Sequence, residues 1–251
     1  MSLDTQIEAL RALLTAHHRI VAFTGAGVSV DSGIPDFRSR GGLWDRLDPM
    51  TLSTDALEAG PTGRVAFWRT MEALADSLGD PHPNPIHHAL VELERQGRLA
   101  GILTQNVDGL HQAAGSDPGL VVELHGNLAW CVEPISEVRF PTPQIMARVK
   151  AGERDPKHAG RPIRPELVVF GDPLPEEAMQ KAWAMAGGCD LMLVLGTSLT
   201  VHPAADLPVL ARHTGAKLAI VTLGRTPVDH LADLRIDAPL LASFVPAVEG
   251  M

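Results

Sequence analysis

The sequence has 251 residues, 45% of them hydrophobic and 20% charged, which are the proportions of a folded globular protein and not of a disordered one. Its formal net charge of −9 would repel polyphosphate backbones, so direct nucleic-acid binding is not expected. Two cysteines, Cys131 and Cys189, cannot form a disulfide framework, and the N-terminus has no apolar leader, so we expect a cytoplasmic protein. The longest apolar stretch, residues 191–195, is far too short to span a bilayer, and no membrane partner is expected.

Apolar residues recur along the chain with two different spacings. Residues 5–17 place Ile7, Leu10 and Leu14 on one face of a helix, and residues 19–23 form a short apolar run typical of a buried strand. Further segments of both kinds follow, with strands at 99–103, 121–124, 191–195 and 217–221 and helices at 84–96 and 203–212. Strands that alternate with helices predict an α/β fold, a Rossmann-like parallel sheet with helices on both faces.

One region breaks this alternation. Residues 129–164 contain several prolines and glycines, and we expect them to form a smaller inserted lobe together with part of 36–80, in which 64–78 is patterned as a helix. The lobe is also rich in cations, which would form either an ordinary solvated surface or a face that attracts acidic partners: Arg139, Arg148, Lys150, Arg154, Lys157, Arg161 and Arg164.

Three of the predicted strands end in polar or glycine-rich turns, at residues 24–27, 104–108 and 196–198. Ligands of open parallel sheets bind at the carboxyl ends of the strands, so we expect these turns to line one crevice. The first turn contains Gly25 and Gly27, where backbone amides can approach a pyrophosphate without interference from a Cβ. Val30 stands where hydride-transfer enzymes need a third glycine, which argues against an ordinary dehydrogenase.

Residues 25–39, which follow the first strand, resemble the signature loop of the sirtuins almost residue for residue. The resemblance continues in the family's order through Gly42-Leu43-Trp44, Thr104-Gln105-Asn106-Val107-Asp108-Gly109-Leu110-His111, His125-Gly126-Asn127, Phe170-Gly171-Asp172 and Gly196-Thr197-Ser198-Leu199. It implies a single catalytic domain over residues 1–251, in which an NAD-binding core surrounds the inserted lobe. It also implies the reaction, an NAD-dependent removal of acyl groups, chiefly acetyl, from protein lysines with release of nicotinamide and O-acyl-ADP-ribose.

The same resemblance assigns the catalytic roles to three residues. His125 would act as the base on a ribose hydroxyl, which suits an imidazole whose ordinary pKa is about 6.5. Asn106 would position the ribose or a water molecule, and Asp108 would bond the nicotinamide amide. Thr222 replaces an asparagine that is usual in the family. The contacts to NAD implied by the resemblance involve Gly25, Ala26, Gly27, Asp36, Phe37, Arg38, Gln105, Asn106, Asp108, Gly196, Thr197, Ser198 and Thr222.

Two features of the sequence concern the substrate. Val168, Phe170 and Gly171 match the extended segment that pairs with the backbone of a substrate peptide, beside an apolar tunnel for the acyl-lysine. Sirtuins that remove acidic acyl groups carry a Tyr-x-x-Arg pair, and Trp68 and Met71 stand at the corresponding positions. Neither side chain can pair with a carboxylate, so we expect acetyl or longer apolar acyl groups.

The sequence departs from the family in the small lobe. Most sirtuins hold a structural zinc there with two Cys-x-x-Cys pairs. The equivalent positions are Cys131 with Pro134 and Asp155 with His158, and Glu133 lies between the first two. Proline cannot ligate a metal, and the mixed set that remains would make a poor zinc site, so no metal is expected.

Other activities share the displacement of nicotinamide, namely transfer of ADP-ribose to protein and hydrolysis of NAD. The complete set of His125, Asn106 and Asp108 favours deacylation, because a base on the ribose hydroxyl is needed chiefly for the later acyl steps. A module that senses NAD without turning it over would be expected to have a damaged catalytic loop or to lack this histidine.

Overall fold

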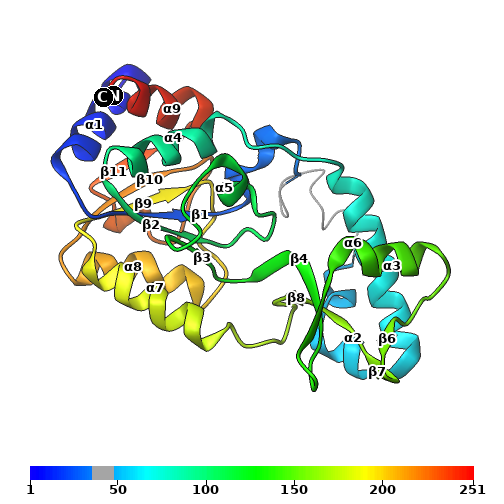
Figure 1. The fold of residues 1–251 in the computed structure, drawn as a ribbon. Helices are drawn as coiled ribbons and strands as arrows, with labels where there is room; N and C mark the ends of the chain where they lie inside the picture. Colours follow the sequence, from blue (N-terminus) through cyan, green and yellow to red (C-terminus); the bar gives the residue numbers. More distant parts are fainter. Residues whose placement is uncertain (36–47) are drawn as a thin grey trace.

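A computed structural model describes residues 1–35 and 48–251 of the protein, apart from the side chain of residue 78. The larger part of the molecule is a six-stranded parallel sheet (Figure 1). Its order is β11-β10-β9-β1-β2-β3, with β1 (Ile20–Thr24), β2 (Leu99–Thr104), β3 (Val121–Glu123), β9 (Leu191–Leu195), β10 (Lys217–Val221) and β11 (Leu234–Ile236). This sheet confirms the predicted fold class.

Helices cover both faces of the sheet. Successive side chains of each strand point to opposite faces, so they pack in two different cores. The helices are α1 (Leu3–Ala16), α4 (Pro85–Arg95), α5 (Leu110–Ala114), α7 (Glu176–Gly188), α8 (Leu207–His213) and α9 (Leu240–Glu249). In β1, Ile20 and Ala22 pack in the core beneath α1, α4 and α9, whereas Val21 and Phe23 pack in the core beneath α7 and α8 (Figure 1). The two chain termini lie side by side next to α1 and α9.

The start of α4 is fixed by a capping box and is tied to the first glycine-rich turn. The Asn84 side chain accepts a hydrogen bond from the Ile86 N–H at 2.9 Å, and His87 Nδ1 accepts one from the Asn84 N–H at 3.2 Å. The Asn84 amide also donates to the Val28 carbonyl at 2.8 Å and to Ser32 Oγ at 2.9 Å. One helix cap therefore holds the turn that follows β1.

The smaller part is a lobe of helices and antiparallel strands beside the sheet (Figure 1). It contains α2 (Thr54–Glu58), α3 (Gly60–Leu78), α6 (Thr142–Lys150), a sheet of order β5-β4-β8 with β4 (Gly126–Glu133), β5 (Val138–Pro141) and β8 (Arg164–Leu167), and a hairpin of β6 (Lys157–His158) and β7 (Arg161–Pro162). Phe67 and Trp68 are fully buried in its core with Ile145 and Ile163. The helix predicted at 64–78 begins earlier, because a proline, favoured in the first turn, extends it to Gly60.

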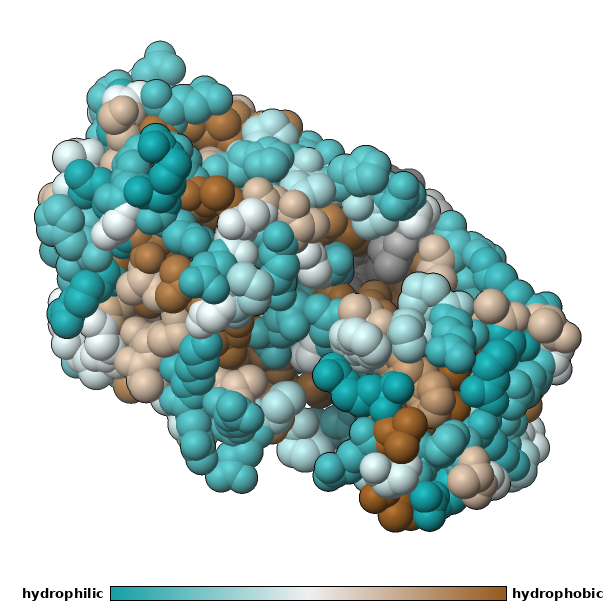
Figure 2. All heavy atoms as spheres, viewed as in Figure 1, coloured by the Kyte–Doolittle hydropathy of each residue, from teal (hydrophilic) through white to brown (hydrophobic). Residues whose placement is uncertain are grey.

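The remaining described elements are short 3₁₀ helices at Ala26–Val28, Val30–Ser32, Pro49–Thr51, Ala204–Asp206 and Asp229–Leu231. Within the two described ranges, no helix combines the length and the apolar character needed to cross a membrane. Figure 2 shows the surface hollowed between the sheet and the lobe, with hydrophilic residues predominating on this face of the lobe.

Candidate active site

The turns that follow β1, β2 and β9 meet at one edge of the sheet, because these three strands are neighbours in the order β9-β1-β2. The Gly25 N–H donates to the Leu195 carbonyl at 3.1 Å, and Gln105 Nε2 donates to Thr197 Oγ1 at 2.9 Å. The Gly27 N–H donates to the Gly196 carbonyl at 2.8 Å. The three predicted turns are therefore brought together in the structure.

Glycine is required where the first and third turns touch. A Cβ on Gly25 would lie 2.6 Å from Thr197 Cβ, and one on Gly27 would lie 2.7 Å from Gly196 Cα. Gly196 itself has a φ of +61°, a conformation that other residues rarely adopt. Ala26 begins the 3₁₀ helix Ala26–Val28 between the two glycines. This turn exposes backbone and little side chain, as a phosphate-binding loop must.

Asp108 and Asn106 converge on a third polar residue, Ser29, to which the sequence alone gave no role. Ser29 Oγ donates to Asp108 Oδ2 at 2.7 Å, and Asn106 Nδ2 donates to Ser29 Oγ at 3.1 Å. The Leu110 N–H donates to Asp108 Oδ1 at 2.9 Å. Burial raises the pKa of Asp108, and these hydrogen bonds only partly offset it. The two predicted residues thus form one buried network with Ser29.

His125 lies between β3 and β4 with its imidazole held in a defined orientation. Its Nδ1 is 3.0 Å from the Gln105 carbonyl, and a carbonyl can only accept, so Nδ1 carries the hydrogen and Nε2 keeps a lone pair. Burial lowers the pKa of His125, although the bond to the Gln105 carbonyl opposes the shift. The side chain is therefore neutral near pH 7 and able to accept a proton at Nε2.

A pair of buried histidines lies behind these turns. His111 Nε2 is 3.0 Å from Thr24 Oγ1 at the end of β1, and the His111 and His87 rings meet edge to face with centroids 5.1 Å apart. Burial lowers the pKa of His111 to about 3 and that of His87 to about 4, so both stay neutral. Neutral buried side chains leave no charge pattern in a sequence, and the pair could not have been predicted from one.

The segment predicted to contact substrate runs between the active-site edge and the lobe. The Val168 N–H donates to the His125 carbonyl at 2.9 Å, the Phe170 N–H donates to the Leu52 carbonyl at 3.0 Å, and the Thr54 N–H donates to the Phe170 carbonyl at 2.9 Å. Gly171 follows in the left-handed region, with a φ of +94°. Backbone bonds on two sides thus fix the position of this segment relative to His125.

Asp172 holds the end of that segment. Its carboxylate accepts from Thr54 Oγ1 at 2.7 Å and from the Val169 N–H at 3.1 Å, and it forms an ion pair with Arg164 of β8. Burial opposes ionisation of this carboxyl, but the bonds from Arg164, Thr54 and Val169 together lower the pKa of Asp172. The sequence had placed Asp172 only in a motif, without this positioning contact.

Other predicted cofactor residues lie at the same edge. Thr222 is buried directly after β10, where the Gly196 N–H donates to the carbonyl of its neighbour Val221 at 3.0 Å. Ser198 is exposed, with its hydroxyl 3.0 Å from Thr200 Oγ1. The remaining predicted contacts, Asp36, Phe37 and Arg38, lie outside the residues that the structure describes.

An apolar cavity of about 220 Å³ opens beside Asp108, between the sheet edge and the lobe. Leu128, which lies three residues after His125 on β4, forms part of its wall. Its described lining consists of Ile34, Met71, Leu74, Ala75, Gly79, Pro81, Asp108, Leu128, Thr142 and Met146. Met71 therefore faces this cavity, whereas Trp68 packs in the lobe core against Phe67.

The residues at the family's zinc positions do not fit a metal. Cys131 is buried with Sγ 3.4 Å from Thr142 Oγ1, and burial raises the pKa of its thiol to about 11, which opposes the thiolate that zinc needs. Asp155 pairs with Arg64, and the His158 ring packs on Phe140 with centroids 5.2 Å apart. Within the described ranges, no three His, Cys, Asp or Glu side chains are grouped as metal ligands.

Comparison with known proteins agrees with this geometry. Residues 25–203 match the Sir2 family. An NAD-dependent protein deacetylase of Thermodesulfovibrio yellowstonii is 41% identical over 216 residues, covering 85% of this chain and 83% of its own. A solved Sir2 structure with deacetylated p53 peptide and 3'-O-acetyl ADP-ribose superposes with a TM-score of 0.89 at 33% identity. A second Sir2 structure, with a propionylated peptide, superposes with a TM-score of 0.85 at 33% identity. Each match covers 97% of both chains.

The chain belongs to the Sir2 family. It is an NAD-dependent protein deacetylase or deacylase, as the sequence predicted, and NAD is its cosubstrate. The family's four-cysteine zinc site is impossible in a chain with two cysteines.

Proposed function

We propose that residues 1–251 act as a single catalytic domain that removes acetyl and similar uncharged acyl groups from lysines of other proteins, with His125 as the base. The observation that carries this proposal is the state of His125. Its Nδ1 is tied to the Gln105 carbonyl on the cofactor side, and its own carbonyl accepts from Val168 on the substrate side. A neutral imidazole in this position can take a proton from a hydroxyl group.

The cofactor-binding roles follow the three turns. The turn of Gly25, Ala26 and Gly27 would lie against the phosphates, where its small residues permit close approach, and Gly196, Thr197 and Ser198 would lie beside the phosphates and a ribose. Gln105, Asn106 and Thr222 would bond sugar hydroxyls. NAD, when bound, supplies a sugar carbon that accepts the acyl oxygen as nicotinamide leaves. Asp108, held by Ser29 and Leu110, would orient the nicotinamide amide. Asp36, Phe37 and Arg38 are proposed to complete the site.

The substrate would bind as an extended peptide along Val168, Phe170 and Gly171. Strand addition of this kind takes its affinity from backbone hydrogen bonds and leaves side-chain specificity to the flanking surface. In support, a related Sir2 enzyme has been solved with a propionylated peptide. The bonds to the His125 and Leu52 carbonyls hold this segment in place and already use the N–H groups of Val168 and Phe170, so the incoming backbone would pair with other backbone groups of the segment.

The acyl group is proposed to be uncharged. Among the described residues that line the cavity beside Asp108, none is cationic, and Met71 and Leu74 offer only apolar surface. An acidic acyl chain would lose its hydration there without gaining a partner, and Asp108 would repel it. Initial rates on matched acetyl-, propionyl-, butyryl- and succinyl-lysine peptides test this; a faster reaction with the succinyl peptide would contradict it.

The decisive experiment separates deacylation from ADP-ribosyl transfer, NAD hydrolysis and NAD sensing without turnover. The protein is incubated with NAD and an acetyl-lysine peptide, and nicotinamide, free peptide and O-acetyl-ADP-ribose are measured together by mass spectrometry. Deacylation yields all three in equal amounts. Nicotinamide without free peptide would instead indicate ADP-ribosyl transfer or NAD hydrolysis, and absence of turnover would indicate a sensing module.

A pair of variants assigns the base. His125→Ala should abolish product formation while preserving the thermal unfolding temperature, whereas His82→Ala, which alters an exposed histidine, should leave the rate unchanged. Full activity of His125→Ala would remove this residue from its proposed role.

A further inference from the structure

The cations of the small lobe are engaged inside the chain. Each of the seven predicted from the sequence lies within 4.0 Å of a carboxylate oxygen in an ion pair: Arg139–Glu166, Arg148–Glu153, Lys150–Asp76, Arg154–Glu72, Lys157–Asp155, Arg161–Glu133 and Arg164–Asp172. A surface built of matched pairs has little net charge to attract an acidic partner. One of these pairs, Arg161–Glu133, has a buried carboxylate beside a partly exposed arginine. Asp155, which stands at one of the positions where other sirtuins hold zinc, forms a further and shielded pair with Arg64.

Glu133 organises the hairpin between β4 and β5 from within. Its side chain is only 1% exposed, and its carboxylate accepts from the N–H groups of Ile135 and Ser136, each at 3.0 Å, and from the Ser136 hydroxyl at 2.5 Å. Arg161 Nη2 reaches the same carboxylate at 2.9 Å from the neighbouring β6–β7 hairpin. One carboxylate thus closes the first hairpin and joins it to the second.

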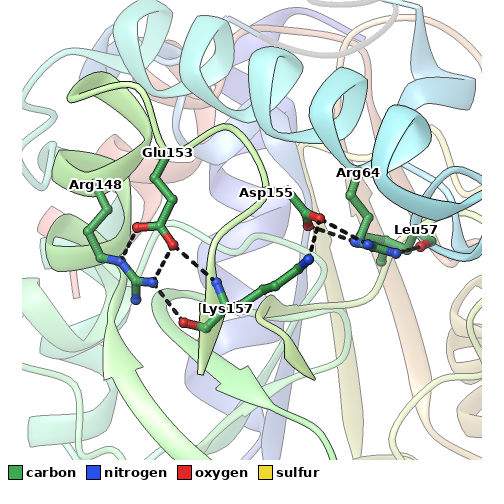
Figure 3. A network of polar contacts seen from close by, with 6 residues as sticks. All are labelled: Leu57, Arg64, Arg148, Glu153, Asp155 and Lys157. Atoms are coloured by element: carbon green, nitrogen blue, oxygen red, sulfur yellow. Dashed lines mark hydrogen bonds and ion pairs between the residues drawn. The ribbon is translucent and has the colours of Figure 1, made fainter. Parts of the chain in front are cut away.

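Asp155 joins the second hairpin to α3. Arg64 of α3 donates to both of its oxygens, from Nε at 2.7 Å and from Nη2 at 2.9 Å, and Lys157 Nζ lies 3.3 Å away (Figure 3). The Arg64 and Asp155 side chains are 13% and 14% exposed. The two-pronged bond to Arg64 lowers the pKa of Asp155. This is a shielded pair with the geometry that makes such contacts strong.

A third contact ties the end of α6 to the same hairpin. Arg148 donates to both oxygens of Glu153 at 2.8 and 2.7 Å and to the Lys157 carbonyl at 2.8 Å (Figure 3). Lys157 therefore lies between two arginine–carboxylate pairs. The network connects α3, α6 and the β6–β7 hairpin, and its longest link in sequence is the one between Arg64 and Asp155, which are 91 residues apart.

We infer that the Glu133–Arg161 and Arg64–Asp155 pairs join the two hairpins to each other and to α3 in place of a zinc site, so that the protein folds without metal. Three of the four groups, Glu133, Asp155 and Arg161, lie on or directly beside the two hairpins that carry Cys131, Pro134 and His158, and Arg64 lies on α3. Asp155 is turned toward Arg64 and Glu133 toward its own turn, so neither carboxylate is available to a metal.

The replacement has a distinct physical signature. A zinc site is lost to a chelator, because its folding energy is metal-binding energy. Ion pairs are not affected by a chelator. Removing one partner of a buried pair lowers the stability of the fold, since the other charge stays buried with less compensation. Hydrogen bonds from Ser136 and Ile135, with the charge of Arg161, lower the pKa of Glu133 to about 2, so this carboxylate stays charged through mildly acidic conditions.

The first test uses the unaltered protein. Bound zinc is measured after purification by mass spectrometry for metals, and thermal unfolding is recorded with and without a strong chelator. We expect no stoichiometric zinc and an unchanged unfolding temperature. Stoichiometric zinc, or a lower unfolding temperature in the chelator, would overturn the inference whatever the enzymatic activity.

The second test uses variants. Arg64→Leu should lower the unfolding temperature by about 10 °C, because the shielded Asp155 carboxylate loses its two-pronged bond and keeps only the partly exposed Lys157 as a partner. Lys150→Ala, which breaks an exposed pair with Asp76, is the matched control and should change it by no more than about 2 °C. The exchange Arg64→Asp with Asp155→Arg should recover part of the loss. Equal effects of Arg64→Leu and Lys150→Ala would contradict the assignment.

Discussion

Gly27→Ala tests whether the close contact between the turns after β1 and β9 keeps the cofactor site in shape. The added Cβ would lie 2.7 Å from Gly196 Cα and 2.9 Å from Gly196 O. Both are backbone atoms, so no side-chain rotation can relieve the contact, and the turns must separate until the distance exceeds 3.0 Å. Overpacking of this kind costs about 2 kcal/mol. For a protein of this length that corresponds to a fall of about 6 °C in unfolding temperature.

The same displacement should damage the use of NAD more than the use of peptide. Small misplacements at a site of reaction can cost up to about 100-fold in rate, so kcat/KM for NAD should fall at least about tenfold. Initial rates against NAD concentration at saturating acetyl-peptide, together with thermal unfolding, measure both effects.

Gly187→Ala supplies the matched control. Gly187 lies in the last turn of α7 with no atom within 4 Å of an added Cβ, so alanine should leave NAD kinetics unchanged and stabilise the helix by at most about 1 kcal/mol. A Gly27→Ala enzyme with normal NAD kinetics and a normal unfolding temperature would refute the reasoning about this contact.

Two further predictions concern the proton and the peptide. Since burial lowers the pKa of His125, the neutral base should persist below the ordinary histidine value of about 6.5, and the decline of kcat/KM for peptide at acidic pH should be centred below that value. A decline centred at or above it would contradict this. Asp172→Asn should raise KM for peptide several-fold and leave KM for NAD unchanged, because the amide weakens the bonds to Arg164 and Thr54, and Asp172→Glu should recover part of the loss. Equal changes in both KM values would mean that Asp172 has no specific role in the substrate segment.

The sequence predicted the sheet and its binding edge because those features depend on local patterns. Apolar runs of five or six residues mark β1, β2 and β9, and the polar turns after them lie next to each other in space because their strands are adjacent in one parallel sheet. The convergence of Gln105 with Thr197 then follows from topology alone.

The lobe and the network around the site could not be predicted in the same way. The strands of the lobe are short and mix polar and apolar residues, so neither alternation nor a continuous apolar run marks them. The partners Arg64 and Asp155 are 91 residues apart, and Ser29 is 79 residues from Asp108. Pairings over such distances depend on how the lobe packs, which no local spacing encodes. The basic stretch could therefore not be recognised as one half of an internal set of ion pairs.

Glu133 is connected through Arg161 to the chain segment proposed to bind substrate. Arg161, its partner, lies in β7, and the chain runs from there through β8 directly into the Val168–Gly171 segment, which begins beside His125. Loosening of the β6–β7 hairpin should thus displace the proposed substrate segment more than the NAD turns, which are anchored in the parallel sheet. Glu133→Gln removes the charge paired with Arg161 but keeps an oxygen for the turn, and we expect it to raise KM for peptide while KM for NAD stays constant. Glu137→Gln, an exposed change in the same turn, should alter neither. If Glu133→Gln raised both KM values equally, or neither, the lobe's ion pairs would have no directed influence on the substrate segment.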